Sequence, residues 1–169
     1  GVWLALIGFF VLNASRAAYQ QIVIQNSLEG RRVVELMTPN PWTASPGMSL
    51  QDIADRVMLA HAISFVPIVD GNRVLGFVDT QLMRRIARAD WPRHTAGAVM
   101  APINPACIIS PRMSADEALK RLAAGPQRKL LVMEGESLRG IVSLRDLIGH
   151  IAVVQALGGD RAGAKRAGP

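Results

Sequence analysis

The sequence predicts an α/β fold of the α+β kind: two β-α-β-β-α repeats packed with pseudo-two-fold symmetry and preceded by a long N-terminal helix. One observation is a Pro-x-Met-Ser motif that occurs twice, at 46–49 and 111–114. A second is that each copy precedes a stretch with helical spacing of apolar residues and then two short apolar runs. A third is that Gly76 and Gly140 occupy the same place within those runs, 64 positions apart. One such unit would expose an apolar face, so we expect two units to bury it together, with clefts between them.

The composition excludes several classes of protein. The chain has 169 residues, of which 50% are hydrophobic, and this is enough to bury a core. Its single cysteine, Cys107, excludes an internal disulfide framework and a metal site made of cysteines alone. The net charge of +6 suits nucleic acid or an anionic membrane surface. Aromatic residues make up only 5% and do not cluster, so we expect no nucleic-acid partner.

The first residues differ from the rest. Residues 1–12 carry no charged or polar side chain, but this run is shorter than the roughly 20 residues that span a bilayer. It lacks the basic leading region and the cleavage site of a signal peptide, and it does not begin with Met. We therefore predict the distal end of a membrane helix, extended into the cytosol as far as Gly30. Arg16, Arg31 and Arg32 favour a cytoplasmic exit, and a buried N-terminal helix of a soluble domain is the alternative.

The first repeat reads as a helix, a hairpin and a second helix. Ser49 stands where a helix N-cap belongs, and the apolar spacing predicts a helix over 50–61. Strands are predicted over 65–69 and 74–78, joined at Asp70-Gly71-Asn72, which is a hairpin signal. A closing helix is predicted over 80–88.

The second repeat follows the same order. Ser114 is the expected N-cap of a helix over 115–124. Strands are predicted over 130–133 and 138–142, and the closing helix over 144–154.

These patterns divide the chain into four parts. Residues 1–30 form the end of the membrane helix and its cytosolic extension, and the two repeats form domains at 31–90 and 91–154. Residues 155–169 are small, glycine-rich and basic, which predicts a disordered tail.

The ordered motifs resemble a tandem pair of CBS domains, also called a Bateman module. The resemblance covers roughly residues 32–154, in two ordered copies. It is carried by Met-Thr-Pro at 37–39, Met-Ala-Pro at 100–102, Val-Pro-Ile-Val-Asp at 66–70, Gly-Phe-Val at 76–78 and Gly-Ile-Val-Ser-Leu-Arg-Asp at 140–146.

Residues 1–17 add a second resemblance, to the last membrane helix of site-2-protease-like intramembrane zinc metalloproteases (M50-type). It implies that the chain is the cytoplasmic regulatory end of a membrane-embedded zinc protease. The chain itself shows no catalytic set, because His61, His94 and His150 lack the spacing of a zinc-protease motif. Asp70-Gly71 reads as a hairpin turn, so we expect any zinc to be held in a domain upstream of the first residue.

CBS pairs commonly hold adenine nucleotides, so the resemblance implies a site for AMP, ADP or ATP. Its ribose-binding signature is Ser or Thr, two residues, then Asp, and a carboxylate can accept hydrogen bonds from both ribose hydroxyls. The second repeat has Ser143 and Asp146 at these positions, whereas the first has Leu82 in place of the aspartate. The resemblance therefore implies one site, in the second repeat, because the first repeat lacks the ribose acceptor. The alternative is that Ser143 and Asp146 only cap the last helix.

The family also places basic groups beside the phosphate. Arg128 and Lys129 match those positions, and ordinary surface charges are the alternative. The resemblance implies that backbone near Ala106, Cys107 and Ile108 faces the adenine. Two further residues carry weaker signals. Trp42 is expected either in the core or in the empty cleft of the first repeat, which lacks the ribose acceptor. Cys107 is expected to be a small buried hydrophobe.

The expected function is a CBS-pair regulatory module that senses adenine nucleotides and controls the membrane protease. Its expected partners are the upstream membrane domain, the membrane, and a second copy bound through the CBS pair. Three alternatives stay open: a transporter or channel as the host, a purely dimerising module, and a stand-alone CBS protein.

Overall fold

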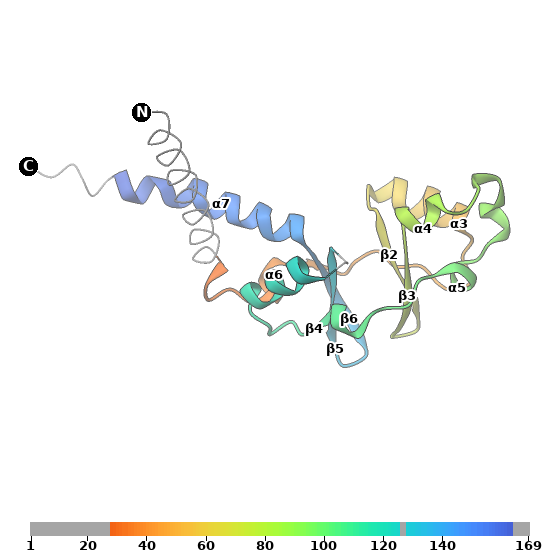
Figure 1. Ribbon diagram of the computed structural model, residues 1–169, viewed down its shortest axis with the longest axis horizontal. Coiled ribbons are helices and arrows are strands. Elements are labelled where there is room, and N and C mark those ends of the chain that lie inside the picture. Colours follow the sequence, from red (N-terminus) through yellow and green to blue (C-terminus); the bar gives the residue numbers. More distant parts are fainter. Residues whose placement is uncertain (1–27, 126–127, 164–169) are drawn as a thin grey trace, which may run out of the picture.

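The computed structural model describes residues 28–125 and 128–163, which form two similar units side by side (Figure 1). The predicted membrane helix and most of its extension lie outside the described residues. Leu28 has helical backbone, and Gly30 follows with a φ of 77°, the left-handed conformation that favours glycine after a helix. None of the helices in the described part of the chain is both long and apolar enough to cross a membrane.

The first unit contains the predicted helix, hairpin and helix. Its elements are α3 (Leu50–Asp52), η1 (Ile53–Leu59), β2 (Phe65–Asp70), β3 (Arg73–Asp79), α4 (Thr80–Arg84), η2 (Arg88–Arg93) and α5 (Ala96–Val99). Ser49 Oγ accepts a hydrogen bond from the Asp52 amide at 3.1 Å, which confirms the predicted N-cap. The closing helix ends at Arg84 rather than Arg88. The chain turns there, and the Trp91 indole donates to the Ile86 carbonyl at 3.1 Å.

The second unit repeats this plan. Its elements are η3 (Pro105–Cys107), β4 (Ile108–Ile109), α6 (Ala115–Ala124), β5 (Lys129–Glu134), β6 (Ser137–Ser143) and α7 (Leu144–Gly163). Both hairpins turn through a glycine with positive φ, 58° at Gly71 and 62° at Gly135. A register shift also occurs at the same place in both, between Ile68 and Val69 and between Val132 and Met133. The internal symmetry predicted from the repeats is therefore present in the backbone.

Helix α7 is longer than the sequence predicted. It continues from Val154 to Gly163, so residues 155–163, which the composition assigned to a disordered tail, are helical. The extension includes Gln155, Ala156 and Leu157, all strong helix formers, and these offset the glycines that follow.

The first unit has one residue more than the second between its N-cap serine and its glycine. The serines lie 65 positions apart, whereas Gly76 and Gly140 lie 64 positions apart. The wider turns of η1, a π-helix, accommodate the additional residue.

Each unit receives its first segment from the opposite repeat. Helix α2 (Val33–Leu36) belongs to the first repeat by sequence, but Val33 and Leu36 are buried in the core of the second unit. The following strand β1 (Thr38–Pro39) pairs with β6, with Thr38 opposite Ile141.

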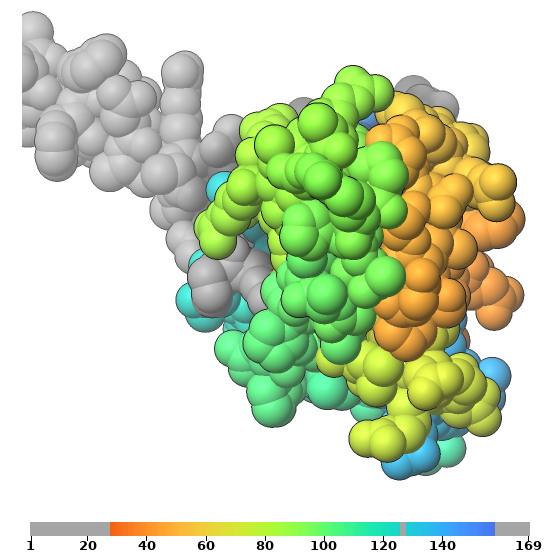
Figure 2. Space-filling model, turned by 90° about the vertical axis from the view of Figure 1, so that its right-hand side faces the viewer, coloured from red at the N-terminus to blue at the C-terminus, as the bar shows by residue number. Residues whose placement is uncertain are grey.

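The reciprocal crossing completes the first unit. Ala96 of α5 is buried in the core of the first unit, and its amide donates to the Met48 carbonyl at 2.8 Å. Figure 2 shows this side of the molecule, where residues near 95–105 (green) lie beside those near 45–50 (orange). The predicted domains 31–90 and 91–154 therefore cut across the structural units, because the start of each repeat packs into the other core.

Candidate functional site

A cleft of about 240 Å³ opens between the two units, and we call it the Asp146 cleft. The second unit contributes Lys129, Ile141, Ser143 and Asp146 to its walls. The first repeat contributes the segment that crosses over, residues 38–42, together with Phe65 of its hairpin and Ile63, which precedes the hairpin. The cleft is therefore polar and charged on one side and mainly apolar on the other.

Ser143 and Asp146 form a reciprocal pair at the start of α7. The Ser143 amide and hydroxyl both donate to Asp146 Oδ2, at 2.9 and 2.7 Å, and the Asp146 amide donates back to Ser143 Oγ at 3.2 Å. These reciprocal hydrogen bonds form a capping box. Ser143 and Asp146 therefore do cap the last helix, which was the alternative interpretation of this pair. The hydrogen bonds engage Oδ2, and within the described residues Asp146 Oδ1 accepts none. The cap thus fixes the carboxylate at the cleft and leaves one oxygen available.

Lys129 lies at the boundary between the two units. Its ammonium donates to Ser64 Oγ at 3.3 Å and lies 5.2 Å from the centroid of the Phe65 ring. Burial lowers the pKa of Lys129 below its usual 10.5, and the nearby carboxylates of Asp146 and Asp79 partly oppose that shift. Its ammonium group is a positive charge at the cleft wall that can pair with a phosphate group, although the two carboxylates beside it would oppose a bound phosphate.

A second cleft, of about 290 Å³, adjoins the first, and we call it the Asp79 cleft. It shares Phe65 and Lys129 with the Asp146 cleft, and its wall also contains Arg128. Asp79 Oδ1 accepts a hydrogen bond from the Leu82 amide at 2.8 Å and so caps α4. The first repeat therefore keeps a capping carboxylate but has Leu82 at the position of the ribose acceptor.

The structure brings together only part of the predicted site. Ser143, Asp146 and Lys129 share the Asp146 cleft, and Arg128 lies in the adjoining one. The predicted adenine contacts Ala106, Cys107 and Ile108 do not line the Asp146 cleft.

These three residues have other environments. Cys107 is buried in the core of the second unit, where desolvation raises the pKa of its thiol, as expected for an unreactive packing residue. The Ala106 amide donates to Asn104 Oδ1 at 2.9 Å, and Ile108 pairs with Leu131 in the sheet. The wall predicted for them is formed by residues 38–42, because that segment crosses into the other unit. The Met-Thr-Pro motif at the start of this segment was recognised in the sequence, but the unit against which it packs was not predicted.

Trp42 occupies neither of the two places expected for it. It is 55% exposed, so it is not a core residue, and it lines the Asp146 cleft rather than the Asp79 cleft. Its ring stacks on His61, with the centroids 3.6 Å apart and the planes 8° from parallel.

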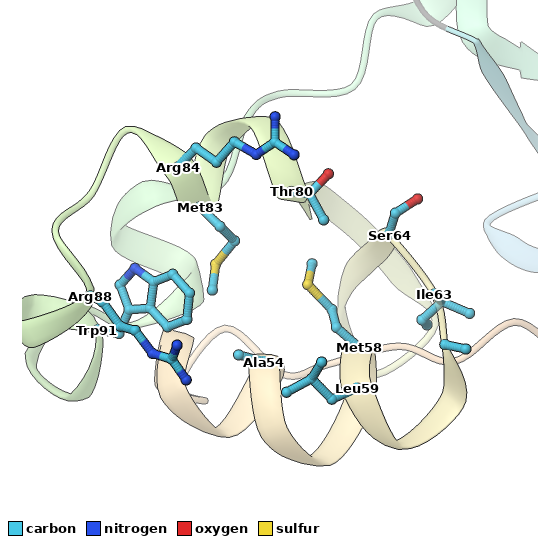
Figure 3. Close-up of a pocket in the computed structure, with 11 residues that line it drawn as sticks. Ala54, Met58, Leu59, Ile63, Ser64, Thr80, Met83, Arg84, Arg88 and Trp91 are labelled. Atoms are coloured by element: carbon cyan, nitrogen blue, oxygen red, sulfur yellow. The ribbon is translucent and has the colours of Figure 1, made fainter.

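A larger concavity, about 560 Å³, lies on the helical side of the first unit, and we call it the helix groove. Met58 of η1 and Met83 of α4 point into it from opposite sides, and Trp91 closes one end (Figure 3). Arg84 and Arg88 also line it. Leu59 lines the groove as well and is 71% exposed.

The described residues include no group of three His, Cys, Asp or Glu side chains close enough to hold a metal ion. Asp70 ends β2 opposite Arg73, and Gly71 lies in the β2–β3 turn, so this dipeptide belongs to a hairpin as predicted.

The profile of the CBS-domain family matches residues 33–87 and 96–153. A candidate zinc metalloprotease of Mycobacterium tuberculosis, Rip3, is 31% identical over 149 residues, which are 87% of this chain and 38% of that protein. A zinc metalloprotease of Methanocaldococcus jannaschii is 22% identical over 152 residues, 90% of this chain and 41% of that protein. The chain thus spans about two fifths of the length of these relatives.

Two solved structures share the fold. The CBS domain of a bacterial CNNM/CorC family Mg²⁺ transporter, in complex with ATP, matches with a TM-score of 0.66 and 23% identity, over 79% of this chain and 97% of that one. CBSX2 in complex with AMP matches with a TM-score of 0.61 and 22% identity, over 75% of this chain and 98% of that one.

Proposed function

The chain belongs to the CBS-domain family, and from that premise we propose that it is a regulatory module that binds an adenine nucleotide in the Asp146 cleft. In this proposal the module lies on the cytoplasmic side of a membrane and controls a site-2-protease-like zinc metalloprotease in the same polypeptide. The observation that carries the proposal is the Asp146 carboxylate, which Ser143 fixes beside the half-buried Lys129 in a cleft between the two units.

The chemistry of the cleft suits a ribose with a phosphate. A carboxylate accepts hydrogen bonds from two adjacent hydroxyls, and Asp146 Oδ1 is available for this. Lys129 lines the same cleft and supplies a positive charge for the phosphate.

The ligand would extend beyond the Asp146 cleft. At about 240 Å³ this cleft is smaller than the roughly 300 Å³ at which small-molecule sites usually begin. The Asp79 cleft adjoins it across Lys129 and contains Arg128. We therefore assign Arg128 to the outer phosphates of a di- or triphosphate, whereas AMP would contact Lys129 alone.

The similar structures support the nucleotide class, since one holds ATP and the other AMP. The relatives support the host, since they are named as zinc metalloproteases and are more than twice as long as this chain. Zinc would then belong to the part of the parent that precedes this chain. The match to the transporter domain, at 23% identity, concerns the fold alone, whereas the metalloproteases match over 87% and 90% of this chain, which favours a protease as the host.

Regulation requires the nucleotide to favour one arrangement of the two units over another. The Asp146 cleft is suited to this because its walls come from both units. A bound nucleotide would hold the units at one relative angle, and the N-terminal segment would pass that change to the membrane domain.

The test has two parts. The first is calorimetric titration of AMP, ADP and ATP into the wild-type chain, Asp146→Ala and Leu82→Ala. We expect Asp146→Ala to weaken binding at least tenfold, because hydrogen bonds to a charged group are strong, and Leu82→Ala to have little effect. Equal effects of the two substitutions, or no binding by the wild type, would refute the site. The second is proteolysis by the full-length parent with and without saturating nucleotide, where identical rates would refute the regulatory role.

The helix groove favours one additional role, that of a contact between two copies of the chain. Met58 and Met83 in the floor of the groove are buried in the core, whereas Leu59, which also lines the groove, is 71% exposed and leaves an apolar side chain at its surface. We propose that two modules associate through this groove.

A further inference from the structure

We infer that Trp42, held in place by His61, is the platform on which the base of the bound nucleotide stacks. This inference rests on the proposed nucleotide site and adds the element that would recognise the base. Trp42 is 55% exposed at the wall of the cleft, where a large aromatic ring contributes little to the core.

The orientation of the indole is fixed. One face lies 3.6 Å from the His61 ring at an angle of 8°, and His61 itself does not line the cleft. His61 therefore supports the indole from outside, and the ligand side stays free. Two residues earlier, Asn40 has a φ of 47°, and its amide donates to the Arg139 carbonyl at 3.2 Å. This hydrogen bond anchors the segment that carries Trp42, in a backbone conformation that asparagine adopts readily.

The cleft has an apolar end and a polar end, and a nucleotide likewise has a planar base and a polar ribose with phosphate. Its apolar end contains Trp42, Ile63 and Phe65, and its polar end contains Lys129 and Asp146. A planar base would lie against the apolar end while the ribose and phosphate occupy the polar end. Base stacking on an aromatic side chain contributes binding energy without requiring a hydrogen-bonding partner.

Two independent asymmetries between the repeats meet in this one cleft. Only the second repeat has the ribose acceptor, since Leu82 replaces Asp146 in the first. Only the first repeat has the aromatic residue, since the small Ala106 and Cys107 lie at the equivalent place in the second. The crossing of residues 38–42 brings the two features together.

The inference is tested by comparing AMP with ribose 5-phosphate, which has the same sugar and phosphate but no base. Both are titrated by calorimetry into the wild-type chain, Trp42→Ala, Trp42→Phe and Asp146→Ala. We expect Trp42→Ala to weaken AMP binding about tenfold and to leave ribose 5-phosphate binding unchanged. Trp42→Phe should keep most of the affinity for AMP, and Asp146→Ala should weaken both ligands.

The outcomes distinguish the stacking role of Trp42 from the nucleotide site itself. If Trp42→Ala binds AMP as well as the wild type while Asp146→Ala does not, the platform is wrong and the nucleotide site stands. If Trp42→Ala weakens both ligands equally, Trp42 only shapes the cleft and the platform is again wrong. If the wild type binds neither AMP nor ribose 5-phosphate, the nucleotide site itself is wrong.

Discussion

Gly140 lies directly against Met37: a Cβ atom on Gly140 would be 2.6 Å from the Met37 sulfur and 2.8 Å from the Thr38 carbonyl oxygen. Gly76 has the same relationship to the other crossing segment. A Cβ there would be 2.6 Å from the Ala101 carbonyl oxygen and 2.9 Å from the Met100 sulfur. The two glycines therefore permit the two exchanged segments to lie flat on the hairpins. The pairing of a Met-x-Pro motif with a glycine in the opposite repeat thus has a direct steric cause.

The first prediction concerns this contact. Gly140→Ala should destabilise the protein by about 1–3 kcal/mol, because the new methyl group meets backbone that cannot move without disturbing the β1–β6 pairing. Chemical denaturation monitored by circular dichroism measures the change. Gly47→Ala is the control, since a Cβ there has no atom within 4 Å and its φ is not positive. Equal stability of Gly140→Ala and Gly47→Ala would show that the crossing can shift without penalty.

Local signals in the sequence predicted the hairpins, their glycine turns and the serine-capped helices. They did so because strand alternation, turn chemistry and N-caps depend on residues close in the chain. The exchange of segments was not predictable in this way. Whether α2 packs on the first or the second unit is decided by contacts between distant residues, and the apolar pattern of Val33 and Leu36 suits either core. The boundary between the domains was therefore drawn by sequence order rather than by packing.

The same reason explains which site residues were found. Ser143, Asp146 and Lys129 were identified from motifs within one repeat, and they share one cleft. Trp42 lies in that cleft only because its segment crosses over, so no local pattern could place it there. Ala106, Cys107 and Ile108 were assigned to the adenine contact on the expectation that each repeat forms its own site.

The second prediction separates the two roles of Asp146. Asp146→Ala should lower the free energy of unfolding by about 1 kcal/mol, because it removes the capping box of α7, and it should also weaken nucleotide binding. Asp52→Ala is the matched control, because Asp52 accepts a hydrogen bond from Ser49 Oγ at 2.8 Å in a similar cap outside both clefts. It should lose similar stability and keep full affinity. If Asp52→Ala also lost affinity, general destabilisation would explain the result for Asp146→Ala.

The third prediction follows from the lowered pKa of Lys129. Burial disfavours its charged form, and a bound phosphate would favour that form again, so binding should raise the pKa towards 10.5. Between the lowered and the raised pKa, the complex holds a proton that the free protein has lost. Nucleotide affinity should therefore fall as the pH rises through the lowered pKa, and binding in this alkaline range should take up protons.

Calorimetry in two buffers with different ionisation enthalpies measures this proton uptake. Lys129→Met should bind more weakly at neutral pH and should lack the alkaline fall in affinity. Lys120→Met is the control, because Lys120 pairs with Asp116 on α6, and it should behave as the wild type does. A wild-type affinity that stays constant up to the usual lysine pKa would argue against a phosphate contact by Lys129.

The fourth prediction concerns association through the helix groove. Leu59 is 71% exposed next to a cavity that Arg84 and Arg88 also line, so a lysine at this position would add a third positive charge beside an apolar contact. Leu59→Lys should weaken self-association at least tenfold, since loss of one central apolar contact commonly has this effect. Sedimentation velocity over a range of protein concentrations measures the change. Ile148→Lys is the matched control, because Ile148 is 54% exposed on α7 and does not line the groove. If Ile148→Lys dissociated the protein and Leu59→Lys did not, α7 would be the contact surface, and the apolar groove of the first unit would have to be explained in another way.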